Sequence, residues 1–501
     1  MPRLKQTGKR VYGWLERRLQ LEGPVKEAAL HKVPRNTASW WYVFGSAAFT
    51  LLMLQIVTGI LLALVYVPSA ADAWSSLNIL NHQIPLGWFL RALHGWGSNF
   101  MVAIVFIHMA QVFLFGAYKY PRELTWTVGV FLLLMTLGMA FTGQVLRFDQ
   151  DAYWGLGIGV FIMARVPGIG GGLVHLLLGG PVIAGATLSR FFTLHVFLIP
   201  GLLLMFALVH VWMVLKLGIN EWPMPGRLVR RSTYVAEYNK LSHDDGIPFV
   251  PDAFWKDLVF SAAVLAAVAV CAAVLGPYGP GGQPDPSIIQ TVPKPDFPFL
   301  WIYAVLSYLP PSMETPFILI APILMIAGLL AVPFVASEGE KSWHRRPIAV
   351  LAMTSVALAW GVLTHLGTFT PWSPHMSAWS SDPLPVRYLR DATPVVRQGA
   401  VVFQAKQCRN CHSIGGLGGQ RGPALDDVAT RMTPDQLRYK VVTGGGNMPA
   451  YGHNLSPPEI EALVSFLETL HPTGEPPAAD AAQQAVESGH IPPPVSGSST
   501  P

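Results

Sequence analysis

The sequence has little charge for its length and few cysteines. Only 13% of its 501 residues are Asp, Glu, Lys or Arg, whereas a soluble domain typically has about 25%. With 51% hydrophobic residues and a mean hydropathy of +0.39, the chain is not a disordered polypeptide, a coiled coil or an ordinary cytosolic enzyme. The three cysteines, at positions 271, 408 and 411, are too sparse for a disulfide framework. This composition indicates a membrane protein.

Several apolar runs are long enough to cross the roughly 30 Å hydrocarbon core of a membrane, which takes about 20 helical residues. Seven such runs are present, at 42–66, 89–117, 126–146, 190–215, 257–276, 313–335 and 347–366. No cleavable signal pattern precedes the first run. A basic amphipathic stretch, Lys9 to Leu21, is compatible both with a helix on the membrane surface and with a solvated helix.

The basic residues are distributed unevenly between the loops. One set of loops holds 20 Lys and Arg residues and comprises 1–41, 117–125, 216–256 and 336–346. The alternating set holds five and comprises 67–91, 147–190 and 277–312. Because Lys and Arg favour the cytoplasmic side, the N-terminus is predicted to be cytoplasmic. After seven spans, everything beyond residue 366 is then predicted to lie outside.

A C-x-x-C-H motif is present near the C-terminus, at Cys408, Cys411 and His412. It is the attachment signature of a c-type haem, because two nearby thiols can form thioethers while the adjacent imidazole reaches the iron. A redox pair or half a zinc site would use the same cysteines, but the chain has no second cysteine pair and no thioredoxin-like strand pattern around them. We therefore expect one covalent haem c.

A methionine downstream of the motif is the expected second iron ligand, since a thioether raises the haem potential. Met448, within a Gly-Asn-Met-Pro run, is the candidate. Met432 is its rival, but it precedes a Thr-Pro pair that is typical of a helix start. With helices expected near Val395–Gln404 and Pro458–Leu470, the segment resembles a class I cytochrome c.

Two of the expected spans carry paired histidines. His94 and His108 are 14 residues apart in the second span, and His195 and His210 are 15 apart in the fourth. Fourteen residues are nearly four helical turns, so each pair shares one helix face with its members about 21 Å apart. Histidines inside a membrane are costly and usually functional. Matched pairs favour two stacked haems with bis-imidazole ligation over hydrogen-bonded packing histidines.

Glycines repeat with the same period in the neighbouring spans. Gly45 and Gly59 are 14 apart in the first span, and so are Gly129 and Gly143 in the third. A glycine lets a flat macrocycle approach the backbone, although small residues also serve helix–helix contact in membranes. The period shared with the histidines favours the haem interpretation.

The second and fourth spans run in the same direction. We therefore expect His94 and His195 to bind an outer-side haem b iron, and His108 and His210 to bind a cytoplasmic-side haem b iron. Arg91, three residues before His94, is placed to pair with a haem propionate.

With these features, the sequence resembles cytochrome b of the Rieske/cytochrome b (cytochrome bc) complexes. The match is closest to the chloroplast and Firmicutes type, in which this region is two polypeptides; here the two are fused, with a cytochrome c behind them. The resemblance covers about residues 9–370 and rests on Val11-Tyr-Gly-Trp14, Gln55-Ile-Val-Thr-Gly59, Arg91-Ala-Leu-His94, Thr187-Leu-Ser-Arg-Phe-Phe-Thr-Leu-His195, Lys216-Leu-Gly-Ile219 and Arg345-Arg-Pro-Ile348.

The resemblance implies quinol oxidation with bifurcated electron transfer. One electron would pass to a Rieske iron–sulfur protein and on to cytochrome c, and the other would cross the membrane through two b haems to a second quinone site. No cysteines are left in this chain to bind an iron–sulfur cluster, so the Rieske protein is expected to be a separate partner. A homodimer is a further family expectation, and the Firmicutes-like branch favours menaquinol over ubiquinol.

The quinol-oxidation motifs depart from the family pattern. A Leu-Pro-Trp type run is replaced by Leu146-Arg-Phe-Asp-Gln150, and Pro-Glu-Trp-Tyr by Pro295-Asp-Phe-Pro298. Quinol oxidation needs a base, and a carboxylate near the ring suits that role. We expect this catalytic base to be Asp296, with Asp149 as second choice and Glu314 as the main rival. A carboxylate that merely caps a loop is the structural alternative for Asp296.

A further departure concerns the extra haem of the chloroplast and Firmicutes type, which is attached to a cysteine early in the first span. The aligned position here is Val43, and the spare cysteine, Cys271, lies in the fifth span as a small apolar residue. We therefore expect no covalent third haem in the membrane part, while a non-covalent haem there stays open.

The expected fold is all-α: a seven-transmembrane-helix cytochrome b bundle with an extracytoplasmic α-helical cytochrome c domain. The expected parts are a cytoplasmic N-terminal segment with an interfacial helix, a four-helix dihaem core, a three-helix C-terminal part of cytochrome b, a linker, the cytochrome c domain and a disordered tail. Their boundaries are 1–41, 42–250, 251–370, 371–392, 393–472 and 473–501.

The expected function is that of a quinol:cytochrome c oxidoreductase subunit in a bacterial plasma membrane, with two haem b, one haem c and coupled proton translocation. A soluble or membrane cytochrome c or a terminal oxidase would accept the electrons, and no nucleic acid is involved. The alternatives are a dihaem b-type membrane anchor of another respiratory enzyme, which should lack the motif at 295–298, and a transporter with an appended cytochrome sensor, which should lack the paired periods.

Overall fold

The computed structural model describes most of both expected domains. The described residues are 13, 14, 16–18, 20, 23, 30–180, 183, 185–285, 294–370, 383–418, 422–444, 448, 450–452, 454–474 and 477–478. Most of the linker expected at 371–392, nearly all of the tail expected at 473–501 and part of the stretch from Lys9 to Leu21 lie outside these residues.

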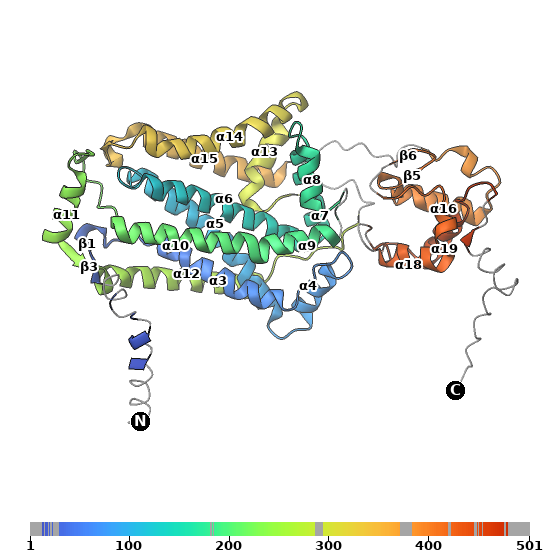
Figure 1. Ribbon diagram of the computed structural model, residues 1–501, viewed down its shortest axis with the longest axis horizontal. Helices are drawn as coiled ribbons and strands as arrows, with labels where there is room; N and C mark the ends of the chain where they lie inside the picture. The colour runs from blue at the N-terminus through green and yellow to red at the C-terminus, as the bar shows by residue number, and fades with distance from the viewer. Residues whose placement is uncertain are drawn as a thin grey trace, which may run out of the picture.

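Seven helices in the described part of the chain are long and apolar enough to cross a membrane (Figure 1). Their main helical segments are α3 (Phe44–Ala63), α5 (Gly87–Leu114), α6 (Glu123–Leu146), α10 (Ile199–Leu217), α12 (Phe254–Leu275), α14 (Pro311–Val335) and α15 (Pro347–Phe369). The predictions of seven spans and of an all-α class are confirmed.

The first five spans pack closely, whereas the last two lie at the edge of the bundle. Helix α3 packs on α5, α12 packs on both, and α10 packs on α6. Apolar side chains from these helices form a common core, including Ala47, Leu51, Met101, Leu203 and Val268. By contrast, only 6% of the apolar window of α14 and 0% of that of α15 is buried. Helices that are apolar all round and exposed suit contact with hydrocarbon.

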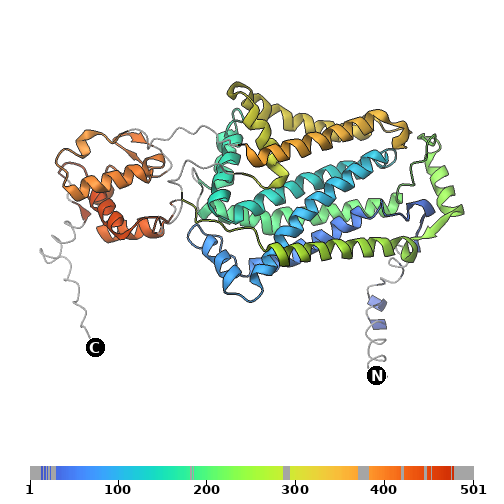
Figure 2. The same cartoon turned by 180° about the vertical axis from the view of Figure 1, so that it is seen from behind.

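Two different sets of short elements close the ends of the bundle (Figures 1 and 2). The end that faces the C-terminal domain carries α4 (Ala73–His82), α7 (Gln150–Ala164), α8 (Gly170–Leu178) and α13 (Leu300–Tyr308). The opposite end carries α11 (Tyr234–Asp244) and the antiparallel pair β1 (Lys32–Pro34) and β3 (Gly246–Pro248). A second antiparallel pair joins β2 (Leu228–Val229) to β4 (Gly339–Glu340). The sequence pattern predicted only loops in these regions.

The fourth span is not one regular α-helix. It consists of α9 (Gly185–Thr193), a five-residue π turn (Leu194–Leu198) and α10. The backbone N–H of Ile199 donates to the carbonyl of Leu194, five residues earlier. A π turn holds one residue more than an α turn, and such turns occur often at functional sites.

The C-terminal domain has its own small helical core. Helix α16 (Pro394–Ala405) packs against α19 (Pro457–Glu468), and α18 (Pro434–Thr443) packs beside it. Gly399 permits the closest approach, because a Cβ atom there would lie 1.8 Å from the Ala462 carbonyl oxygen. Both α16 and α19 start within one residue of the predicted helices. Thr433 caps α18 through a capping box, as the Thr-Pro pair indicates.

Candidate haem and quinone sites

The four histidines of the bundle line two cavities. His94 and His195 line a cavity of about 580 Å³ toward the end with α7, which we call the outer cavity. His108 and His210 line a cavity of about 480 Å³ toward the end with α11, which we call the inner cavity. Each cavity therefore contains one histidine from the second span and one from the fourth. These are the two pairs that the sequence predicts at the same depth in the bundle.

The outer pair has the geometry of two ligands to one metal ion. The ring centroids of His94 and His195 lie 6.2 Å apart. Two imidazoles that bind one ion from opposite sides, with metal–nitrogen bonds of about 2 Å as in zinc sites, have centroids roughly 6 Å apart. The spacing of the two rings fits an iron between them.

Hydrogen bonds orient both outer rings. The Thr58 hydroxyl donates to the Leu54 carbonyl at 2.7 Å, so its oxygen accepts from His94 Nδ1 at 2.9 Å. Thr142 likewise donates to a carbonyl of its own helix and lies 2.9 Å from His195 Nδ1. A proton held on Nδ1 leaves the Nε2 lone pair free for a metal. The donor set therefore fits bis-imidazole haem ligation.

Each of the four periodic glycines lies against one of these imidazole rings. A Cβ atom at these positions would meet the Cε1 atom of a histidine at 3.2 Å (Gly59, His94), 2.8 Å (Gly143, His195), 3.3 Å (Gly45, His108) and 3.6 Å (Gly129, His210). Contacts below 3.4 Å require the neighbour to shift. Gly45, Gly59 and Gly143 thus leave the space that the rings occupy, whereas the contact at Gly129 is of ordinary van der Waals length. This role adds to the close approach of a macrocycle that glycine permits.

The π turn accounts for the unequal spacing of the two histidine pairs. His195 lies within the turn, and His210 lies in the regular α10 that follows. Since the turn holds one extra residue, 15 residues in this span have the rotation of 14 in a regular helix. Both pairs therefore face the same side of their helices despite the different counts.

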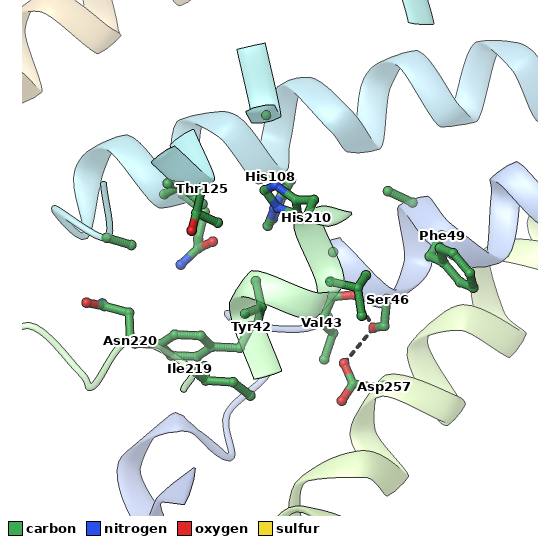
Figure 3. A pocket seen from close by; sticks show the side chains of 18 of the residues that line it. Tyr42, Val43, Ser46, Phe49, His108, Thr125, His210, Ile219, Asn220 and Asp257 are labelled. Carbon is green, nitrogen blue, oxygen red and sulfur yellow. Dashed lines mark hydrogen bonds between the residues drawn. The ribbon is translucent and has the colours of Figure 1, made fainter. Parts of the chain in front are cut away.

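The inner cavity extends past its histidines to a second, polar wall (Figure 3). Tyr42, Val43, Ser46 and Asp257 form part of this wall. The Ser46 hydroxyl donates to an Asp257 carboxylate oxygen at 2.5 Å. Val43 occupies the position at which the resemblance places a haem-bearing cysteine in related proteins, and it is 2% exposed.

Charged side chains gather at the mouth of the outer cavity. Arg91, Arg147 and Asp296 all line it. Arg147 Nη1 lies 3.4 Å from Asp296 Oδ1, and its guanidinium stacks 4.6 Å from the ring centroid of Tyr278. Burial raises the pKa of Asp296, and the charge of Arg147 partly opposes this rise. Arg91 donates to the Asn81 side chain at 3.1 Å and to carbonyls of the loop that contains Tyr278.

The three candidate carboxylates have different surroundings. Asp149 is the N-cap of α7, where it accepts from the Ala152 N–H at 2.9 Å, and its side chain is 2% exposed. Glu314 pairs with Arg165 at 3.1 Å. Asp296 makes no side-chain capping bond to its own short helix and is the one of the three that lines the outer cavity.

The C-terminal motif has the arrangement of a haem c site. His412 Nδ1 lies 2.8 Å from the Pro423 carbonyl oxygen, which fixes the proton on Nδ1 and leaves Nε2 free. Gly422 lies against this ring, since a Cβ atom there would be 2.4 Å from His412 Cε1. Cys408 and Met448 both pack at the edge of the domain core, as does the rival Met432. The cysteines, the histidine and Met448 therefore belong to one domain and fit haem c.

Two threonines at the outer site have a sequence pattern that the histidine and glycine periods alone did not reveal. Thr58 and Thr142 each directly precede a periodic glycine, so a Thr-Gly pair recurs in the first and third spans. The contact between Arg147 and Asp296 and that between Ser46 and Asp257 have no such local signal, because each joins residues far apart in the chain.

Comparison with known proteins finds relatives of both the helical bundle and the C-terminal domain. The family model of cytochrome b/b6/petB matches residues 30–218. The model of cytochrome C oxidase, cbb3-type, subunit III matches residues 394–467. A solved structure described as hyperthermophilic respiratory Complex III superposes with a TM-score of 0.61 and 27% identity, and the match covers 72% of this chain and 92% of that one.

Several known sequences match between 42% and 58% of this chain. Cytochrome b6 of Synechococcus elongatus is 35% identical over 211 residues, which are 42% of this chain and 98% of that protein. The menaquinol:cytochrome c reductase cytochrome b subunit of Geobacillus thermodenitrificans is 36% identical over 218 residues, 42% of this chain and 97% of that protein. The chain covers 49% of a Chlorobaculum thiosulfatiphilum cytochrome bc complex cytochrome b subunit (39% identical over 42% of this chain), so it spans about half of that relative.

The fold and the paired histidines define a membrane-embedded cytochrome with a cytochrome c domain behind it. The chain belongs to the cytochrome b/b6 family and carries a C-terminal domain of the cbb3-type cytochrome c kind. These matches imply haem b in the bundle and haem c in the C-terminal domain.

Proposed function

We propose that this chain is the cytochrome b and c subunit of a quinol:cytochrome c oxidoreductase. It oxidises menaquinol at the outer cavity, sends one electron to a Rieske protein and the other across the bundle, and couples this flow to proton translocation. The observation that carries the proposal is the pair of stacked histidine cavities, the outer of which also contains a partly buried carboxylate. The Geobacillus relative, named as a menaquinol:cytochrome c reductase subunit, supports the choice of quinol.

When bound, two haem b and one haem c supply one-electron carriers. His94 and His195 would hold the outer iron, and His108 and His210 the inner iron. In the C-terminal domain, Cys408 and Cys411 would form the thioethers, with His412 and Met448 as iron ligands. No cysteine aligns with Val43, so the proposal includes no covalent third haem.

Asp296 is the proposed base at the outer cavity. Its carboxylate accepts a hydroxyl proton from the quinol as the ring gives up its electrons. Burial raises the pKa of this carboxyl, which makes it a better proton acceptor than an exposed aspartate, and Arg147 partly opposes the rise. Pro295 and Phe297 give the adjoining wall an apolar surface that suits a quinone ring.

The inner cavity is the proposed site of quinone reduction. Its wall holds the Ser46–Asp257 hydrogen bond within reach of a ring that lies beyond His108 and His210. The chain's 20 basic residues in one set of loops support a cytoplasmic position for this end of the bundle. The C-terminal domain then lies outside, where the Rieske partner would deliver its electron.

Haem stoichiometry tests the proposal. Pyridine haemochrome quantification of the purified chain should give two haem b for each covalent haem c, and a haem-stained denaturing gel should show covalent haem on this polypeptide. Absence of haem b would refute the proposed function. Covalent haem that survives a double Cys408→Ala and Cys411→Ala substitution would instead refute the assignment at Val43.

A further inference from the structure

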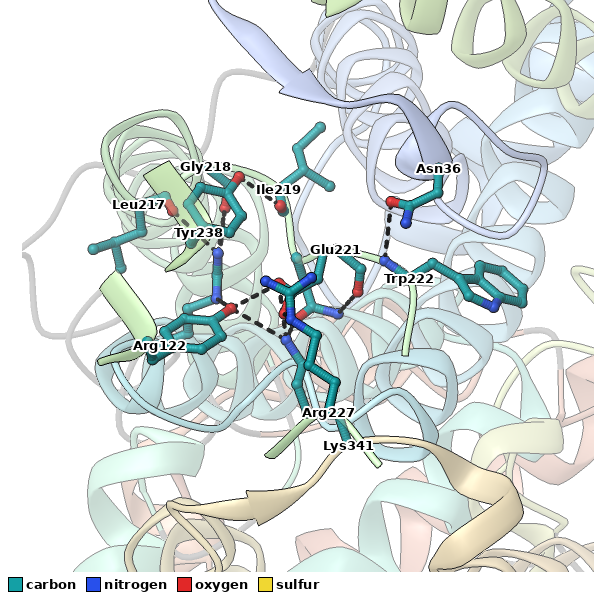
Figure 4. Close-up of polar contacts among 12 residues, drawn as sticks. Asn36, Arg122, Leu217, Gly218, Ile219, Glu221, Trp222, Arg227, Tyr238 and Lys341 are labelled. Carbon is teal, nitrogen blue, oxygen red and sulfur yellow. Dashed lines mark hydrogen bonds and ion pairs between the residues drawn. The ribbon is translucent and has the colours of Figure 1, made fainter. Parts of the chain in front are cut away.

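A buried polar cluster closes the inner cavity at its α11 end (Figure 4). We call it the Lys341 cluster; it consists of Lys341, Glu221, Asn220, Tyr234 and Arg122. The side chain of Lys341 is 3% exposed and that of Glu221 is 1% exposed. Ionisable side chains so deeply buried are unusual unless they are paired or functional.

Lys341 is the centre of this cluster. Its Nζ lies 3.1 Å from Glu221 Oε2, donates to the Asn220 side-chain oxygen and lies 3.2 Å from the Tyr234 hydroxyl. Tyr234 in turn donates to Glu221 Oε2 at 2.7 Å and accepts from Arg122 at 2.8 Å. The β2–β4 pairing holds the two loops that carry Glu221 and Lys341 together. The cluster is one continuous hydrogen-bonded network.

The cluster connects the cavity with the protein surface. Asn220 and Arg122 line the inner cavity, and Tyr42 lies beside Asn220 at the same wall (Figure 3). On the other side, Arg227 Nε lies 3.9 Å from Glu221 Oε1, and the Arg227 side chain is 26% exposed. Lys341 is therefore one side chain away from the cavity, while its partner Glu221 is one side chain away from water.

The two buried ions differ in how firmly they hold their charge. Burial lowers the pKa of Lys341 to about 7, helped by Arg122 and Arg227 and opposed by Glu221. Burial acts to raise the pKa of Glu221, but Lys341, Tyr234 and Arg122 outweigh it and the net pKa is lowered. The other ionisable groups around the pair are Tyr42 and Tyr238. Lys341 therefore gives up its proton more readily than an exposed lysine, whereas the lowered pKa of Glu221 favours its ionised form.

A purely structural role explains this arrangement poorly. A buried ion pair is often no more stabilising than apolar side chains of the same shape, and here the carboxylate of Glu221 faces three cations, Lys341, Arg122 and Arg227. Such a pair next to a cavity suggests a use for its exchangeable proton.

We propose that Lys341 delivers protons to quinone reduced at the inner cavity and that Glu221 positions it. This inference rests on the proposed function. Reduction of one quinone takes two electrons, which two quinol oxidations at the outer cavity supply, and two protons. For each proton, an N–H bond of the Lys341 ammonium breaks and an O–H bond forms on the reduced quinone. Water beside Asn220 and the Tyr42 hydroxyl carries the proton across the cavity wall. Water on the Arg227 side then returns a proton to the neutral amine.

Two substitutions at one position separate proton delivery from charge. Lys341→Met removes the proton and the charge, whereas Lys341→Arg keeps the charge but does not release a proton near neutral pH. In purified complex, haem b reduction by menaquinol and its reoxidation by added menaquinone are followed separately by absorbance, with a pH dye for proton uptake. Both variants should reoxidise haem b at least about 10-fold more slowly, with normal reduction, and a small weak acid should restore the rate.

A matched control is the exposed pair of Arg35 and Asp245 in the same set of loops, with side chains 66% and 60% exposed. Asp245→Asn should change neither rate. Haem b content and the unfolding temperature show whether each variant is folded. Glu221→Gln should move the pH profile of reoxidation to lower pH, because Lys341 loses the partner that raises its pKa.

A wild-type rate in Lys341→Arg, or slow variants that weak acid does not restore, would overturn proton delivery alone. Failure of menaquinol to reduce haem b in the unaltered protein would overturn the proposed function as well.

Discussion

At the scale of single residues, the outer cavity contains a carboxylate and a cation that come from different halves of the cytochrome b region. Asp296 and Arg147 meet at 3.4 Å although neither is near the other in sequence. Asp149, two residues after Arg147 in the chain, caps helix α7. Because Asp296, Arg147 and Asp149 have different surroundings, we expect each to respond differently to substitution.

Asp296→Asn is expected to slow quinol oxidation by about 100-fold or more, because a general base contributes roughly that much. The haem b spectra should stay unchanged. The matched control is Asp149→Asn, in which asparagine caps a helix as well as aspartate does, so turnover should be retained. Stopped-flow reduction of haem b by quinol measures both variants. Unchanged turnover in Asp296→Asn would move the base to Asp149 or Glu314.

Arg147→Met is expected to change how the rate depends on pH. Burial raises the pKa of Asp296 and Arg147 lowers it, so loss of the cation raises this pKa further. The carboxylate is then protonated over a wider range, and the acidic limb of the pH–rate profile moves to higher pH. Arg147→Lys, which keeps a cation, should move the limb less. A profile that is identical in wild type and Arg147→Met would contradict the coupling.

Thr58→Val tests the orientation of the outer histidine. The isosteric change leaves the buried Nδ1–H of His94 without its acceptor, and loss of such a partner typically weakens metal binding by about 10–100-fold. The ratio of haem b to haem c should therefore fall. Thr50→Val is the control on the same helix, since Thr50 donates to the backbone carbonyl of Ser46. Equal haem b content in the two variants would count against this role.

At the scale of secondary-structure elements, the fourth span depends on its π turn. The turn absorbs one residue between His195 and His210, so that the turn presents His195 and α10 presents His210 to the same side of the span. Regular helix would rotate one ring by about 100° for every residue added or removed. The position of a deletion in this span should therefore matter more than the residue deleted.

Deletion of Phe197, an exposed residue in the π turn, is expected to convert the turn to regular α-helix and to retain both haem b groups. Deletion of Leu208, which is also exposed but lies in regular α10, should rotate His195 away from His210 and remove haem b. Pyridine haemochrome spectra of the two purified variants measure this difference. Loss of haem b from both, with both still folded in the membrane, would argue against the π turn as the source of the spacing.

At the scale of the whole molecule, the two ends of the bundle differ in composition. The loops with few basic residues lie at the end that faces the C-terminal domain, and the basic loops lie at the α11 end. A c-type haem outside the membrane and a proton-taking site inside would place the two half-reactions on opposite sides. Such an arrangement stores energy as a transmembrane potential.

Cysteine labelling tests this orientation. Lys240→Cys on α11 and Arg397→Cys on α16 both place a thiol at an exposed position. On intact cells, a membrane-impermeant maleimide should label Arg397→Cys alone, and permeabilised cells should be labelled at both positions. Labelling of Lys240→Cys in intact cells would reverse the topology.

The sequence by itself determined the features that are local. Span count follows from run length, and the proposed haem c site from five consecutive residues. Helical periodicity predicts which histidines and glycines lie at the same depth in the bundle, since each of these features depends on neighbours within a few turns. The sequence left Asp149, Asp296 and Glu314 as competing bases, and it contained no sign of the helices that close the outer end.

Only the tertiary structure decided which distant groups meet. It brought Arg147 to Asp296, Ser46 to Asp257 and Lys341 to Glu221. It also contained the π turn that explains the 15-residue spacing of the histidines in the fourth span. The physical reason is that burial and hydrogen bonding are properties of a packed neighbourhood. A neighbourhood of this kind forms only when segments far apart in the chain lie side by side.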